Sequence, residues 1–340
     1  MSDVAKEVGV TVTAVSAVLR GSGNGTGNVR VSPDTARRIR RIASRLGYRP
    51  NMAARLLKGQ RNNVLGVLIG AESTPANYER LSALEQEAFR RGLRLMIGQF
   101  RGDSERTAQY IEDFLGRGIE GVMCFENPTP SYDEHVLRSL RRFRGVVFQT
   151  RRLFPGALCV DVDRAAGVRA AVAHLLARGR RRIGLLLNDR PENDPLMADR
   201  LAGYEEGLVQ AGREYEGRQV WMGPGVYPPP PELAAEAVGA LAEQAGVDAI
   251  VCCNDVWAIH LIKAMRRLGK SVPEDLAVIG FDNINAAELF DPGLTTIDQN
   301  NAAFAAAAMD LLVAACEGVA IPVSRRTRIV PPRLIVREST

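Results

Sequence analysis

Cysteine and histidine are scarce in this chain of 340 residues, which has five cysteines and three histidines. The cysteines are odd in number and lack C-x-x-C spacing, so we expect small core residues, neither disulfides nor metal ligands. His135, His174 and His260 fall in separate expected helices without metal-ligand spacing. G-x-S-x-G, P-loop and Rossmann motifs are also missing. These absences argue against an enzyme and predict no cofactor and no metal.

Long apolar runs are missing too. No stretch of 18 or more apolar residues occurs, and polar and charged residues stand where a secretory signal would have its apolar segment. We therefore expect a cytoplasmic protein with no membrane contact. With 46% hydrophobic and 24% charged residues, the chain has the composition of a globular protein with two or three domains.

Acidic residues are rare at the start of the chain. Residues 1–60 carry eleven basic and three acidic side chains, a net charge of +8, so the remaining 280 residues sum to −3. A local basic excess is typical of phosphate binding, because each neutralised phosphate releases counterions. A solvated surface rich in arginine is the alternative, which the segregation of the charge makes weaker.

The segment from Asp3 to Leu19 has the pattern of two short helices around a turn at Gly9. Two such helices form a helix-turn-helix, although a helical hairpin inside a globular core would have the same pattern. The second helix would present small side chains outward, which lets a helix enter a DNA major groove about 12 Å wide. These outward residues are Thr11, Val12, Thr13, Ser16 and Ala17.

Ser32-Pro33-Asp34 is typical of a helix start and predicts a third helix from Pro33 to Leu46, which would close an all-helical headpiece. The glycine-rich run before it has no Lys-Ser or Lys-Thr pair, so we interpret it as a surface loop and not a phosphate cradle. Asn51 can cap a helix from Met52 to Lys58 that is too short to be stable alone. That helix is a candidate hinge.

From Val64 onward apolar strands alternate with amphipathic helices, which predicts parallel α/β architecture with both sheet faces covered. Ten strands are more easily placed in two similar lobes than in one sheet, with ligands at the carboxyl ends of strands or between the lobes. We expect strands near 64–69, 93–97, 121–125, 146–148, 158–161, 183–187, 219–221, 249–253, 277–281 and 295–297. Helices are expected near 77–91, 103–117, 132–142, 164–178, 198–212, 231–245, 255–268 and 300–317.

Ten segments in this order resemble the lactose/galactose-repressor (LacI) family of bacterial transcription regulators. They are DVAKEVGVTVTAVSAVL, RVSPDT, RLGYRPNMAARLLKG, NNVLGVLI, ARGRRRIGLL, RLAGYEEGL, VCCNDVWAI, VPEDLAVIGFDN, PGLTTIDQN and PPRLIVREST. The resemblance implies a DNA-binding headpiece, a hinge helix, a two-lobed periplasmic-binding-protein-like (type I) effector domain crossed three times by the chain, and a nucleoid-associated homodimer on double-stranded, pseudo-palindromic operator DNA.

The resemblance also implies domain boundaries. We expect a helix-turn-helix domain at residues 1–49, a hinge helix and linker at 50–61, and an effector-binding domain at 62–340. Within that domain, lobe 1 would comprise about 62–158 plus 283–312, and lobe 2 about 159–282 plus 313–340.

By the same resemblance, Val12, Thr13 and Ala17 stand where family members read base edges, and Leu57, beside Ala54, stands where they insert a leucine into the minor groove. The full expected DNA-binding set is Thr11, Val12, Thr13, Ser16, Ala17, Ser32, Thr35, Tyr48, Asn51, Ala54 and Leu57. Family members usually have arginine at the Ala17 position. Alanine offers only apolar contact to a thymine methyl, so we expect an operator half-site that differs from the usual one.

Two further departures concern the headpiece. Only Met1 and Ser2 precede Asp3, where the family usually has a threonine and an aliphatic residue. We therefore expect either a start further upstream or a marginal headpiece. The glycine loop is about six residues longer than usual, so no phosphate contact is assigned to Asn28 or Arg30.

In the effector domain the resemblance points to Arg200, Asn254, Asp255 and Asp282 as hydrogen-bonding ligand contacts. Asn254 and Asp255 could instead cap the next helix, and Asp282 a turn. Trp257 and Tyr227 are candidate stacking faces for a sugar or base, or else core residues. The usual acidic residue near Gln149 is missing, which leaves the ligand class open.

We expect a DNA-binding regulator, of the repressor type, under allosteric control by a small sugar-like effector, with either sign of control. The alternatives are a purine- or nucleoside-responsive regulator of the same family, or a solute-binding module without DNA function.

Overall fold

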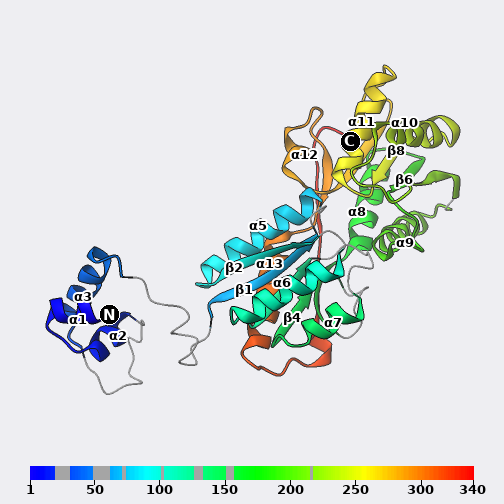
Figure 1. Ribbon diagram of the computed structural model, residues 1–340. Coiled ribbons are helices and arrows are strands. Elements are labelled where there is room, and N and C mark those ends of the chain that lie inside the picture. The colour runs from blue at the N-terminus through cyan, green and yellow to red at the C-terminus, as the bar shows by residue number, and fades with distance from the viewer. Residues whose placement is uncertain are drawn as a thin grey trace. The chain divides into compact units, whose positions relative to one another are not determined.

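The computed structural model describes residues 1–19, 31–48, 62–70, 74–100, 103–125, 133–150, 157–214 and 217–340. The chain forms two compact units, residues 1–62 and residues 63–340 (Figure 1). The predicted hinge helix, with Asn51, Ala54 and Leu57, and the glycine-rich loop, with Asn28 and Arg30, lie outside the described residues.

The first unit is the helical headpiece expected from the sequence, with α1 Ser2–Val8, α2 Val12–Leu19 and α3 Pro33–Arg45. Gly9 ends α1 with a φ of 76°, a left-handed conformation that glycine adopts without steric cost. Ser32 caps α3 as its sequence predicts, since its hydroxyl oxygen accepts from the Thr35 N–H at 3.2 Å. The buried faces of all three helices meet in one core: Val4, Ala5, Val8, Val15, Ile39, Ile42 and Ala43.

The second unit contains two six-stranded sheets, and all ten predicted strands are present with ends that differ by at most three residues. The first sheet has the order β11-β5-β4-β3-β1-β2, and all its pairings are parallel. Its strands are β1 Val64–Gly70, β2 Arg94–Phe100, β3 Gly121–Phe125, β4 Gly145–Phe148, β5 Leu158–Val162 and β11 Thr327–Val330.

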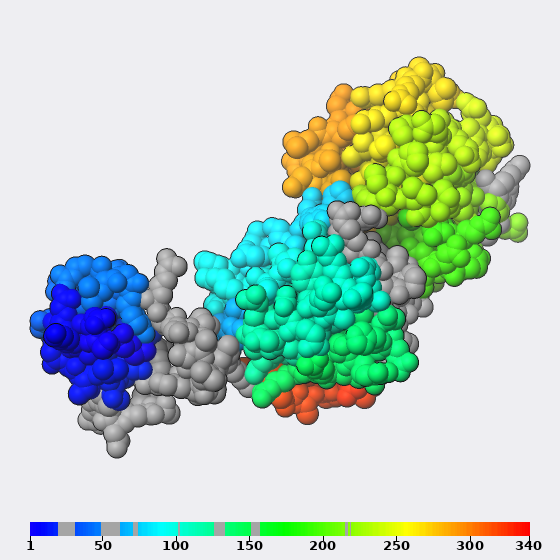
Figure 2. Space-filling view, viewed as in Figure 1, coloured from blue at the N-terminus to red at the C-terminus, as the bar shows by residue number. Residues whose placement is uncertain are grey.

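Helices cover both faces of this first sheet, which makes its central strands apolar on both sides. Val67 and Ile69 of β1 pack under α5 Pro75–Arg90 and α13 Asn301–Cys316. Leu68, between them in sequence, points to the other face, under α6 Ser104–Gly116 and α7 Glu134–Leu140. In Figure 2 the cyan to teal residues of these helices cover much of the surface of this lobe.

The second sheet has the order β12-β10-β9-β8-β6-β7, and β12 alone pairs antiparallel. Its strands are β6 Ile183–Leu187, β7 Val220–Met222, β8 Ala249–Cys252, β9 Ala277–Asp282, β10 Thr295–Asp298 and β12 Arg333–Ile335. The helices around it are α8 Arg164–Ala177, α9 Pro195–Gln210, α10 Pro231–Val238, α11 Asp255–Arg267 and α12 Asn285–Leu289. One continuous apolar core joins this sheet to its helices.

The chain crosses between the sheets three times, as expected, but at points that correct the expected lobe boundaries. Leu158–Val162 pairs with β4 and β11 and so belongs to the first lobe, whereas Thr295–Asp298 pairs with β9 and belongs to the second. Residues 299–330 lie with the first lobe, so the expected assignment of 313–330 to the second lobe is wrong, and only the last ten residues lie with the second (Figure 1). Strand pairing fixes these boundaries, and pairing partners are distant in sequence. The first lobe is therefore residues 63–162 and 299–330, and the second is 163–298 and 331–340.

Three short elements were not predicted. Strands β11 and β12 are half exposed and therefore lack an apolar run, and α12 has only five residues. Two 3₁₀ turns, Gly217–Gln219 and Val323–Arg325, also lie between longer elements. The helix expected at 231–245 is α-helical only to Val238 and continues as a π turn, Gly239–Gln244.

Close packing of α9 on α8 positions one functional side chain. A Cβ at Gly203 would meet the carbonyl oxygen of Ala165 at 2.3 Å, so only glycine lets the two helices approach this closely. Arg200 lies three residues earlier on the same helix, and its guanidinium lies 4.5 Å from the ring centroid of Phe281 in β9. In the described part of the chain, no helix is long and apolar enough to cross a membrane.

Candidate functional site

The outward face of α2 carries the small side chains predicted for a reading helix. Thr11, Val12 and Thr13 are exposed, and Ser16 and Ala17 are partly exposed. Thr11 also caps the helix, since its hydroxyl oxygen accepts from the Ala14 N–H at 3.2 Å. The opposite face, with Ala14 and Val15, is buried against the rest of the headpiece. The side chains of the predicted face are thus exposed or partly exposed, whereas the opposite face is buried.

Helix α3 adds positive charge to the headpiece. Arg37 pairs with Asp34 and Arg45 with Glu7. Three more arginines on the helix are exposed and make no ion pair within the described headpiece: Arg38, Arg40 and Arg41. Of the other predicted DNA contacts, Ser32 is exposed, and its hydroxyl oxygen lies 2.8 Å from the hydroxyl oxygen of Thr35. Tyr48 packs on the headpiece core.

In the second unit, charged side chains lie near the ends of strands from both sheets. Arg200 is 5% exposed, and its Nε and Nη1 donate to the carbonyl oxygens of Cys253 and Leu196, each at 3.0 Å. Its nearest charged neighbours are Arg164, Asp282 and Asp194, and burial lowers the pKa of its guanidinium. Arg200, in α9, thus reaches the carboxyl end of β8 through its hydrogen bond to Cys253.

Asp282, the last residue of β9, lies within electrostatic reach of Arg80, Arg164 and Arg200. It is 7% exposed and accepts a hydrogen bond from Gln299. Its φ of 118° is rare for a residue with a side chain, and such conformations are concentrated at ligand sites. Burial raises the pKa of the Asp282 carboxyl to about 6, and the three arginines and Gln299 only partly oppose this rise.

A pH-dependent stability follows from this raised pKa. Between about pH 4 and pH 6 the folded protein binds the Asp282 proton more tightly than the unfolded chain, so the free energy of unfolding falls as pH rises. The decrease is at most about 2 to 3 kcal/mol and ends above pH 6. Asp282→Asn should flatten this slope. Urea titrations followed by tryptophan fluorescence measure it, since both tryptophans lie in the second lobe; an unchanged slope would contradict the assignment.

Arg80 of α5 joins this site to the first lobe. Its side chain is 2% exposed and lies 4.2 Å above the ring centroid of Phe304. Its three nitrogens donate to the side-chain oxygens of Asn301 at 3.1 Å, Gln149 at 3.2 Å and Gln299 at 2.6 Å. Because Gln299 also contacts Asp282, a hydrogen-bonded chain runs from the first lobe through the second crossing into the second lobe.

Tyr227 is half-buried near the same carboxyl. Burial, and then the charges of Asp282 and Cys253, raise the pKa of its phenol. The structure therefore brings together three of the six predicted ligand contacts: Arg200, Asp282 and Tyr227. Sequence reasoning missed Arg80, Arg164, Asn188 and Gln299; Asn188 and Gln299 directly follow strands, which is a usable signal, whereas Arg80 lies in a helix that reads as amphipathic.

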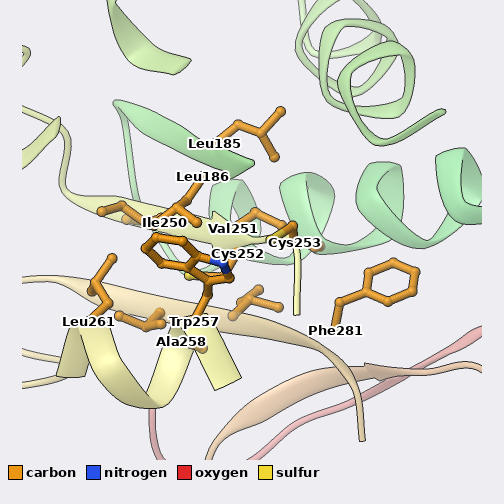
Figure 3. Packing of buried hydrophobic residues seen from close by; sticks show 14 of the residues in the cluster. Leu185, Leu186, Ile250, Val251, Cys252, Cys253, Trp257, Ala258, Leu261 and Phe281 are labelled. Atoms are coloured by element: carbon orange, nitrogen blue, oxygen red, sulfur yellow. The ribbon is translucent and has the colours of Figure 1, made fainter. Parts of the chain in front are cut away.

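The other three predicted contacts have structural roles, and the complete burial of Asp255 and Trp257 corrects the prediction for these two. Asn254 caps α11 by accepting from the Trp257 N–H at 2.9 Å. Asp255 is fully buried and accepts from the Thr296 hydroxyl and from the Ile284 N–H. Trp257 has no exposed surface and packs edge-on against Trp221 with ring centroids 5.2 Å apart, among the apolar side chains of β8 and α11 (Figure 3). It therefore cannot offer a stacking face.

Asp255→Ala should lower the free energy of unfolding by about 2 to 4 kcal/mol, because it leaves two buried donors without an acceptor. Glu288→Ala, at an exposed position in the same lobe, is the matched control and should change stability by less than about 0.5 kcal/mol. Urea unfolding followed by tryptophan fluorescence gives both values. Equal stability of the two variants would show that the hydrogen bonds from Thr296 and Ile284 to Asp255 do not stabilise the lobe.

The described residues contain no group of three His, Cys, Asp or Glu side chains placed to hold a metal ion. The cysteines are all buried and reduced, and burial raises the pKa of Cys252 and Cys253.

A basic helix-turn-helix unit, followed in the chain by a two-lobed unit with polar groups at its strand ends, defines the class of ligand-responsive DNA-binding regulators. Comparison with known proteins agrees: residues 1–51 match the model described as "Bacterial regulatory proteins, lacI family", and residues 172–340 match the "Periplasmic binding protein-like domain". The chain belongs to the lacI family of transcriptional regulators and carries its effector-binding domain.

The similarity to individual relatives spans the whole chain. The HTH-type transcriptional repressor PurR of Mannheimia succiniciproducens is 28% identical and covers 100% of this chain and 98% of its own. The transcriptional regulator CelR in its cellobiose complex is 25% identical, with a TM-score of 0.69 and coverage of 99% and 98%. The Lac repressor dimer bound to operator is 21% identical, with a TM-score of 0.77 and coverage of 99% and 97%, a likeness of fold.

Proposed function

We propose that this regulator is a repressor whose affinity for operator DNA is set by a small, sugar-like effector bound where the strands of the two lobes end. The observation that carries the proposal is the meeting of Arg200, Asp282 and Tyr227 at those strand ends. Guanidinium donors, a carboxylate acceptor and a half-buried ring are the groups that recognise a polyhydroxylated ring. A relative whose structure holds cellobiose supports the same ligand class.

The hydrogen-bonded chain from Gln149 through Arg80 and Gln299 to Asp282 supports a mechanism for the control. Gln299 lies in a segment that crosses between the lobes, so a ligand that engages Asp282 changes the contacts at the crossing. The angle between the lobes then sets how the hinge holds the reading helices, and Leu57 docks or withdraws. A coupling free energy of about 1 to 3 kcal/mol suffices for such control, and its sign follows from the lobe angle that the ligand favours.

A homodimer is part of the proposal, because a pseudo-palindromic operator presents two equivalent half-sites. Exposed apolar side chains on α5 and on the edge strand β2 support it: Tyr78, Phe89 and Ile97 are 41%, 60% and 50% exposed. Exposed apolar side chains on a helix and its adjacent edge strand are a surface that a second copy could cover.

Selection of binding sites from random DNA tests the operator part. We expect a pseudo-palindrome whose half-site differs from the one usual in the family, because Ala17 and Val12 offer only apolar contact where arginine would read guanine. The selection should be repeated with Ala17→Arg, which should recover a guanine at the matching position. Recovery of the usual family half-site by the natural chain would contradict this prediction.

A nucleobase or nucleoside effector is the second candidate. Tyr227 offers one stacking face beside Asp282, whose carboxylate can accept from a ring N–H. A thermal-shift screen of sugars, sugar phosphates, nucleobases and nucleosides separates the two classes. Function as a solute-binding module without DNA binding is disfavoured by the basic headpiece, and the absence of salt-sensitive retention on DNA-cellulose would revive it.

A further inference from the structure

Three buried arginines surround the site, and only one of them has a carboxylate partner in contact. Arg164 pairs with Asp161 at 2.6 Å. Arg80 donates to three amide side chains, and Arg200 donates to two backbone carbonyl groups. Among the described residues, therefore, two almost fully buried guanidinium groups contact uncharged acceptors only.

Burying a cation without a counter-ion in contact costs free energy, and the pKa values of both guanidinium groups reflect this cost. Burial lowers the pKa of Arg80 to about 10 and also lowers that of Arg200. The mutual repulsion of these groups with Arg164 adds to the effect. Asp282 is near both, but it is held by Gln299 and itself ionises reluctantly. Asp194 also lies near Arg200, and burial raises the pKa of its carboxyl. Three carboxylates therefore stand near the three arginines, but among the described residues neither Arg80 nor Arg200 has one of them in direct contact.

A second observation concerns Asn188, directly after β6. Its side-chain oxygen is buried and accepts no hydrogen bond from any residue that the structure describes, which is rare for a buried acceptor. The backbone N–H of Asn188 faces the thiol of Cys253, and the carbonyl of Cys253 accepts from Arg200. Asn188, with its unpartnered side-chain oxygen, and the guanidinium of Arg200 therefore both lie next to Cys253.

We propose that the effector is a small hydroxylated anion: a carbohydrate with a carboxylate or phosphate group that accepts from Arg200 and a hydroxyl group that donates to Asn188. Charge-assisted hydrogen bonds to the anion would supply the missing counter-charge, and the hydroxyl would satisfy the bare oxygen. Arg80 is a positioning residue in this account, since its contacts are within the protein and its charge adds to the potential. The proposal rests on the proposed effector function of the same site.

Matched pairs of ligands test the proposal on the full-length chain. Glucose is compared with gluconate, glucuronate and glucose 6-phosphate, and galactose with galacturonate and galactose 1-phosphate, by thermal shift and calorimetry. Inorganic phosphate and hypoxanthine are included as a bare anion and an uncharged base. We expect at least one sugar anion to bind roughly 100-fold more tightly than its neutral partner. Whether carboxylates or phosphates bind distinguishes the two sources of the anion.

The variant Arg200→Gln keeps a hydrogen-bond donor but removes the charge. It should reduce the preference for the anion over its neutral partner to about threefold or less. Thermal unfolding without ligand checks that the variant is folded. Arg169→Gln, at a partly exposed arginine paired with Glu206 on the neighbouring helices, is the matched control and should keep the full preference.

Equal binding of neutral and anionic partners, binding of hypoxanthine alone, or binding of none of the sugar anions would overturn the proposal. An Arg200→Gln variant that keeps the preference would overturn it as well. These outcomes are separate from failure of the proposed function. A neutral ligand that changes operator affinity refutes only the anion, whereas ligands that bind without changing operator affinity refute the proposed control.

Discussion

Replacing Arg200 with methionine is expected to abolish the response of DNA binding to the effector while operator affinity without effector changes little. Methionine keeps most of the length and apolar contact of the arginine stem but removes every donor. Loss of charge-assisted hydrogen bonds in a buried site should weaken effector binding at least about 100-fold. Calorimetry with the effector and fluorescence anisotropy with labelled operator measure the two quantities.

The structural cost of this change is modest. The carbonyl oxygens of Cys253 and Leu196 each lose one donor, which is expected to cost about 1 to 3 kcal/mol of stability. Arg169→Met, on the exposed side of α8, is the control and should keep both binding activities. A folded Arg200→Met variant that still responds to the effector would remove Arg200 from the binding site.

Thr13→Glu is expected to reduce operator affinity by roughly two to three orders of magnitude. Thr13 is exposed on the face of α2 that we place in the major groove, and a carboxylate there would be repelled by the phosphates on both sides. Effector binding should stay unchanged, because residues 1–62 form a unit separate from residues 63–340.

A control with the same change of charge is available in the headpiece. Ser44 is exposed near the end of α3, outside the predicted reading helix, and Ser44→Glu should lower operator affinity less than about tenfold. Anisotropy titrations at two salt concentrations separate the general loss of attraction from the loss at the reading face. Equal losses in both variants would mean that α2 is not the reading helix.

The elements that sequence predicted well are those whose signals are local. Helix α3 begins at Pro33 because the hydroxyl of Ser32 caps it and proline fits its first turn, and both signals lie in adjacent residues. The central strands of each sheet are continuous apolar runs, since helices bury both of their faces. For such elements the local sequence pattern is enough to predict the element.

The lobe boundaries depended on pairings that no local pattern shows. β5 lies beside β11, more than 160 residues later, and β10 lies between β9 and β12. The two edge strands contributed by the last segment of the chain are short and half exposed, so neither carries an apolar signature.

The type of site could be predicted from the sequence, but only some of its residues could. Arg200 and Asp282 follow from their segments, but Asp255 looks equally suited to a ligand until Thr296 and Ile284 are seen to occupy it. Arg80 reads as a surface residue because its burial is created by α13, which follows more than 200 residues later. Which charges meet at the strand ends depends on the fold, so a local sequence pattern does not predict it.

Operator affinity measured with and without a bound effector tests the central claim most directly. The operator obtained by selection is titrated with the full-length chain, first alone and then with a saturating ligand from the thermal-shift screen. We predict that the ligand changes operator affinity by about 5- to 150-fold and that operator changes ligand affinity by the same factor. A ligand that saturates the second unit and leaves operator affinity unchanged would contradict the account.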